Sequence, residues 1–145
     1  MSFKITPNVA IAAISAAAAE IEVGDTEEFG SLSIWSGPVP DNALDIIDVE
    51  VNDILATTPL PSPTFGLPSE ISENLYGALG YAITGVIGLT TGIATFFRIY
   101  NRDGDPVFQG EVSEDTSESL QVNQINITEG AEVNIIRTII TQSLG

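Results

Sequence analysis

The change in hydrophobic period along the chain limits its possible folds more than any other feature. From residue 30 onward apolar and polar residues alternate, as in Ser31-Leu32-Ser33-Ile34, and glycine or proline residues interrupt the alternation at short intervals. Such alternation is typical of half-buried strands, and the interruptions are typical of turns. Before residue 25 an alanine-rich run takes the place of the alternation. The sequence therefore predicts one N-terminal helix followed by a series of short strands.

Residues 1–24 are predicted to form a helix or arm. Thr6-Pro7 is a typical helix start, because the threonine hydroxyl can accept a hydrogen bond from a free N–H group and proline fits the first helical position. The helix should cover residues 8–23 and end at Gly24-Asp25. Its apolar side chains form one stripe, which consists of Ile11, Ile14, Ala18 and Ile21. The stripe could contact another subunit or pack against the chain's own sheet.

Residues 25–145 are predicted to form one β-sandwich domain. Asn101 to Asp105 should be a hairpin turn, because its Asp-Gly pair tolerates positive φ. The strand before this turn carries large apolar groups on both faces, so it should be central in the sheet. Short strands joined by turns favour a mainly β fold, specifically an antiparallel β-sandwich. The pattern does not distinguish a jelly-roll from an immunoglobulin-like topology. Strands are expected at residues 30–36, 54–58, 93–100, 106–112, 131–141 and, with a bulge or break, 120–127.

The uncharged segment at residues 74–97 has two interpretations. Its 24 residues are long enough to span a bilayer, and Arg98 and Arg102 follow it where stop-transfer cations would lie. It also contains five glycines and several threonines, and it leads directly into a strand-like run. These features favour two buried strands around a Gly/Thr turn over a membrane span.

The charge of the chain is strongly negative. Twenty Asp and Glu residues stand against four Lys and Arg residues, which gives a formal net charge of −16. Nucleic-acid phosphates and anionic membrane surfaces are bound by clustered cations, which four scattered residues cannot provide. No nucleic acid and no membrane is therefore expected among the partners. The acidic connector at residues 41–53 should face solvent or a basic partner.

The residue types that most often carry catalysis are missing. The chain has no cysteine and no histidine, so disulfides, cysteine nucleophiles and histidine-based triads are excluded. Carboxylate pairs are inevitable among twenty acids and do not by themselves indicate acid/base chemistry. The glycines of residues 77–92 lack the spacing and the lysine of a phosphate-binding loop. No catalytic residue and no cofactor is predicted.

Two groups of acids and one aromatic residue have alternative interpretations. Asp103-Gly104-Asp105 has the spacing of a calcium loop, but the strand resumes at once and favours a plain hairpin. A second group of acids consists of Asp41, Asp45 and Asp48. These side chains could bind a cation together or belong to a solvated connector. The solvated connector is favoured, and no metal site is predicted. Trp35 could be an exposed contact residue or part of the core.

Three longer segments carry a resemblance. They are residues 30–40 (GSLSIWSGPVP), residues 95–104 with 107–110 (TFFRIYNRDG and VFQG), and residues 120–133 (LQVNQINITEGAEV). With the alanine-rich helix before them, they resemble a family of small structural proteins of tailed-phage virions, of the head decoration or cement type. The resemblance covers nearly the whole chain. The chain departs from the family pattern in its long acidic connector and its strong negative charge.

The resemblance implies a non-enzymatic virion protein on the capsid surface that stabilises the head shell by subunit packing. Its implied partners are the major capsid protein and neighbouring copies of itself, as a homotrimer. A tail, neck or fibre-associated subunit is the alternative, followed by a membrane protein spanning at 74–97 and a carboxylate-based hydrolase. The candidate interface residues are Ile11, Ile14, Ala18, Ile21 and Trp35.

Overall fold

The helix begins where the sequence predicts. The computed structural model describes residues 3–145, and helix α1 covers Pro7–Ala19. The Oγ1 atom of Thr6 accepts a hydrogen bond from the N–H of Val9 at 3.3 Å. One 3-10 turn, η1 (Glu20–Glu22), extends the helix, and the chain leaves it at Gly24 with a φ of +109°. Glycine is suited to this position because residues that have a β-carbon are strained at such φ values.

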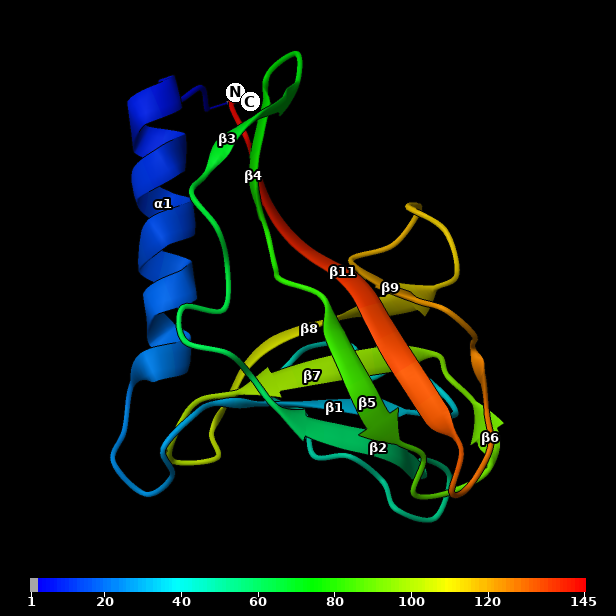
Figure 1. Ribbon diagram of the computed structural model, residues 1–145. Helices are drawn as coiled ribbons and strands as arrows, with labels where there is room; N and C mark the ends of the chain where they lie inside the picture. The colour runs from blue at the N-terminus through cyan, green and yellow to red at the C-terminus, as the bar shows by residue number, and fades with distance from the viewer. Residues whose placement is uncertain (1–2) are drawn as a thin grey trace.

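Four antiparallel strands form the first part of the sheet (Figure 1). In spatial order they are β2 (Ile54–Pro59), β1 (Ser31–Trp35), β7 (Phe96–Tyr100) and β8 (Pro106–Ser113). The four residues from Phe96 to Ile99 are all buried, so both faces of β7 are covered. The prediction of a central strand before the hairpin is confirmed.

The second part of the sheet is built around the long C-terminal strand, β11 (Glu132–Ser143). One edge of β11 pairs with β9 (Leu120–Val122), and the other pairs with β5 (Ile83–Ile87) and then with β4 (Leu75–Leu79). The outermost strand is β3 (Ser69–Ser72), which pairs with β4. A separate two-stranded sheet joins β6 (Gly92–Ile93) to β10 (Asn126–Ile127).

One strand pair corrects the expectation of an entirely antiparallel sheet. Strands β8 and β9 are parallel, with Val112 opposite Leu120. Residues 114–119 form an acidic loop between the two strands. The loop places the start of β9 beside the end of β8, so that both strands run in the same direction. The carboxylate of Asp115 stabilises this loop by accepting a hydrogen bond from the N–H of Ser117 at 2.8 Å. The protein is therefore mainly β and sandwich-like, with one N-terminal helix and a mixed sheet.

The helix shares one hydrophobic core with the sheet. It lies beside β4 and β11 and contacts both strands (Figure 1). Ile14 and Ile21 belong to the same buried cluster as Leu32, Leu120 and Ile135. Of the two arrangements considered for the apolar stripe, the structure has the one in which the helix packs on the chain's own sheet.

The uncharged segment at 74–97 forms strands β4, β5 and β6 and enters β7. Among the described residues, no helix has the length and apolar character needed to cross a membrane. The prediction that this segment forms strands is confirmed, but it contains three strands before β7 and not two, and the prediction of burial is wrong for β5, where only Val86 is buried. Strand β5 pairs only with β11 and lies at the edge of the sheet, so solvent reaches it.

Candidate interaction surfaces

The residues predicted to form an interface are held mostly by the chain itself. Ile14 and Ile21 are 3% and 0% exposed, whereas Ile11 and Ala18 are half-buried. Trp35 is also half-buried, and its ring stacks on Phe96 with centroids 6.3 Å apart and planes 10° from parallel. The structure therefore gathers four of these residues along α1 and η1 and places Trp35 elsewhere, on β1.

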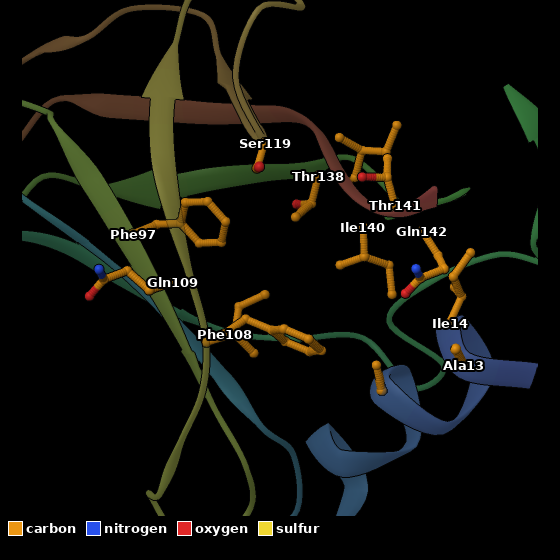
Figure 2. Close-up of a pocket in the computed structure, with 13 residues that line it drawn as sticks. Ala13, Ile14, Phe97, Phe108, Gln109, Ser119, Thr138, Ile140, Thr141 and Gln142 are labelled. Atoms are coloured by element: carbon orange, nitrogen blue, oxygen red, sulfur yellow. The ribbon is translucent and has the colours of Figure 1, made fainter. Parts of the chain in front are cut away.

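A cavity of about 210 Å³ lies between α1, β8 and β11. Figure 2 shows Phe97 and Phe108 on one side of it and Ile140 and Thr141 on the other, with Ile14 on the helix below. All thirteen lining residues are uncharged. The hydroxyl groups at the cavity therefore have no ionisable lining residue to act as a base, and the cavity has no arrangement typical of acid/base or nucleophilic catalysis.

The acidic connector, residues 41–53, is tied to the outer face of the first four strands. The Nδ2 atom of Asn52 donates to the carbonyl oxygens of Ser36 and Pro38 at 2.8 and 2.9 Å. The Nε2 atom of Gln109 donates to the carbonyl oxygen of Pro40 at 2.7 Å. Asn52 is itself buried. The connector and the residues before it are therefore an ordered surface element.

Arg98 lies beneath this element. It is 3% exposed, and its Nε donates to Oε1 of Gln109 at 2.8 Å while its Nη2 donates to the carbonyl oxygen of Asn42 at 3.2 Å. Burial raises the pKa of the neighbouring Tyr100 phenol, and the positive charge of Arg98 offsets part of this effect. Arg98 is therefore an internal support of the connector.

The outer side of the connector exposes aliphatic side chains. Leu44, Ile46 and Val49 are 77%, 96% and 76% exposed, and Val51 is also exposed. Sequence reasoning treated residues 41–53 as an acidic connection and missed these residues. The available signal was the alternation of aliphatic residues with Asp and Glu from Leu44 to Val51. Large aliphatic groups exposed together on an ordered element are typical of contact surfaces.

Two of these side chains, Ile46 and Val51, line a hollow of about 300 Å³. Its lining combines the apolar groups of Val39, Ile46 and Val51 with three carboxylates, which are those of Asp41, Asp45 and Asp48. Two of these carboxylates hold the loop in shape: Asp45 accepts from the N–H of Asn42, and Asp48 accepts from the N–H of Glu50. The remaining acid of the hollow is Asp41, and among the described residues no hydrogen bond is donated to its carboxylate.

One of the two hairpin acids, Asp103, makes a structural contact. Oδ1 of Asp103 accepts hydrogen bonds from the N–H groups of Asp25 and Thr26 at 3.0 and 3.1 Å and from Oγ1 of Thr26 at 2.8 Å. These bonds lower the pKa of Asp103 below its ordinary value, and the bond from the N–H of Asp25 has the largest effect. Within residues 3–145, no group of three or more His, Cys, Asp or Glu side chains is arranged to hold a metal ion.

Comparison with known proteins returned no relative: no protein-family model, no curated protein and no solved structure matches the chain.

Proposed function

We propose that the protein is a non-catalytic structural subunit of a tailed-phage virion, of the capsid decoration or cement type. The observation that carries this proposal is the exposure of Leu44, Ile46 and Val49 on an element that hydrogen bonds hold in place. A surface of this kind works by contact with another protein. The resemblance of residues 30–40, 95–104 with 107–110, and 120–133 to virion structural proteins supports the same assignment.

The chemistry of the cavity also favours a role in contact over a role in catalysis. Its lining residues are uncharged, and it lies between the helix and the sheet of one chain. The proposed partners are the major capsid protein and neighbouring copies of this chain, in a homotrimer on the capsid surface. A cement protein of this type stabilises the shell by burying area across subunit boundaries.

Localisation tests the proposal. Purified virions should contain the chain in many copies, and electron cryomicroscopy should place a domain of this fold on the outer surface of the shell. Particles assembled without the chain should bind it from solution and should resist heat better once it is bound. Absence of the chain from purified virions would contradict the proposal.

A tail, neck or fibre-associated subunit is the second candidate, because it would use the same kind of contact surface. The same images distinguish the two. Density confined to the tail, or a copy number too small to cover the shell, would favour the second candidate.

A further inference from the structure

The hollow in the acidic connector has both an apolar and an acidic lining. Its apolar lining comes from Val39, Ile46 and Val51, and its acidic lining includes Asp41. Ile46 is 96% exposed, so its side chain has almost no contact with the rest of the chain. Apolar surface in a hollow with an acidic rim is complementary to a long cationic side chain, which has an aliphatic stem and a charged end.

We propose that this hollow is the docking site for a basic protein surface, whose Lys or Arg side chain inserts between Ile46 and the carboxylates of the connector. This inference rests on the proposed function and deepens it, because it gives the chemistry of the shell surface that the chain would contact. The stripe on α1 is not this site, since Ile14 and Ile21 lie in the chain's own core.

The charge of the connector decides between a second copy and a different partner. Residues 41–53 contain five carboxylates and no Lys or Arg. Two connectors placed against each other would bring like charges together and remove them from water, which is unfavourable. The net charge of −16 adds a general repulsion between copies. The occupant of the hollow is therefore a basic surface of another protein.

The support beneath the connector favours tight binding. Gln109, Arg98 and Asn52 hold the loop by hydrogen bonds to its backbone or to the residues before it. A loop that is already ordered loses little conformational freedom when a partner binds, so less of the interaction is offset by ordering. The exposed aliphatic groups then supply the contact area, and the carboxylates supply the preference for a basic partner.

The first experiment measures binding of variants to shells assembled without the chain. Ile46→Ser should weaken binding about tenfold, as expected for an apolar group at the centre of an interface. Its matched control is Leu67→Ser, because Leu67 is 92% exposed in a different loop. The control should bind within about twofold of wild type. Equal affinity of Ile46→Ser and wild type would overturn the proposal, as would an equal loss in the control.

The charge is tested in the same assay. Asp41→Asn should weaken binding several-fold at low salt and leave a smaller salt dependence, since one exposed charge pair is lost. Glu73→Gln is the matched control, because Glu73 is exposed at the turn between β3 and β4. An unchanged salt dependence for Asp41→Asn, or the same change for Glu73→Gln, would contradict the basic partner.

A second probe separates this inference from the proposed function. A synthetic amphipathic peptide of Lys and Leu is titrated into the wild-type chain, and NMR shifts are followed for each backbone N–H. Shifts concentrated at residues 39–52 are expected, and shifts spread over the acidic surface would overturn the docking site. If wild type fails to bind shells while the peptide maps to the hollow, the proposed function fails and the docking site stands. If shells bind wild type and Ile46→Ser equally, the function stands and the docking site fails.

Discussion

Gly104 is the residue on which the hairpin between β7 and β8 depends. Its φ is +83°, and its N–H donates to the carbonyl oxygen of Asn101 at 3.1 Å. Oδ1 of Asn101 accepts from the N–H groups of Asp103 and Asp105, both at 3.0 Å, which closes the turn. The sequence predicted this turn because Asp-Gly is a local signal, and the positive φ of Gly104 is confirmed.

Replacing Gly104 with valine should destabilise the protein by about 1–3 kcal/mol, the usual cost of a strained backbone conformation. A β-carbon at this position would meet nothing within 4 Å, so the loss would come from the backbone and not from a clash. Gly104→Asn is the control and should cost less, because asparagine adopts positive φ more readily. Urea unfolding measures both. A chelator should leave the melting temperature of wild type unchanged, and a clear fall would show a metal in the hairpin.

Asp103 shows what local sequence signals do not contain. Its place in the turn was predictable, but its hydrogen bonds to Asp25 and Thr26 join positions 78 and 77 residues apart in the chain. Such a contact depends on how the segment after η1 crosses the hairpin. The nearby Arg102 adds a second link, because its Nε donates to the carbonyl oxygen of Glu27 at 2.8 Å.

The lowered pKa of Asp103 predicts a pH dependence of stability. A carboxylate whose pKa is lower in the folded state stabilises the fold above its ordinary pKa of 3.8, and this contribution is lost as the pH falls through the folded-state value. Asp103→Asn should therefore be less stable than wild type at neutral pH, and the difference should shrink as the pH falls below 3.8. Urea unfolding along an acid series measures it. If the difference in stability between wild type and Asp103→Asn were constant with pH, the charge of Asp103 would contribute nothing to the stability of the fold.

At the scale of the element, helix α1 is part of the core. Ile14 is 3% exposed and packs in the main hydrophobic cluster, whereas Val9 on the same helix is 50% exposed. Ile14→Ala should cost about 2–5 kcal/mol, the range for truncating a buried aliphatic side chain. Val9→Ala is the control and should stay within about 0.5 kcal/mol of wild type. Equal stabilities of the two variants would mean that the helix is detached in solution.

Deleting residues 1–24 tests the same packing more severely. The deletion uncovers the surfaces of β4 and β11 that α1 contacts and removes Ile14 and Ile21 from the core. We expect a product without cooperative thermal unfolding, measured by circular dichroism. A folded product that fails to bind shells would instead support the helix as an arm that reaches another subunit.

The elements that the sequence predicted well are those with local signals. The cap at Thr6, the strand β1 and the glycine turn at Gly104 each depend on a few adjacent residues, and the structure confirms all three, although Ser33 of β1 is buried together with Leu32 and Ile34. The parallel pairing of β8 with β9 and the exposure of β5 depend on distant segments. Local periodicity specifies that a segment is a strand, but it does not specify which neighbour the strand pairs with.

At the scale of the whole molecule, the candidate docking surface was only partly predictable. Composition indicated that the connector would face solvent or a basic partner. The hollow at Ile46 could not be predicted, because it depends on Gln109 and Arg98, which belong to strands far along the chain. The helix stripe was instead the expected contact, because an amphipathic pattern has the same appearance whether it packs on its own sheet or on a neighbour.

The net charge of −16 predicts that salt stabilises the folded state. Folding brings the carboxylates closer together than they are in the unfolded chain, so their repulsion opposes folding. Salt shortens the Debye length from about 10 Å at 0.1 M to about 3 Å at 1 M and weakens this repulsion. The melting temperature should therefore rise with sodium chloride, and a gain of about 1 kcal/mol corresponds to roughly 3–4 °C for a chain of this size.

The control for this salt effect is a variant with fewer negative charges on its surface, made by Asp41→Asn, Glu50→Gln, Glu73→Gln and Glu129→Gln. All four side chains are exposed. The variant should melt at a higher temperature than wild type at low salt, because less repulsion opposes its folding, and its melting temperature should rise less as salt is added. Differential scanning calorimetry of both proteins measures the two slopes. If the melting temperatures of the two proteins rose equally with salt, salt would be acting through a general strengthening of apolar burial. Repulsion among the surface carboxylates would then not oppose folding measurably.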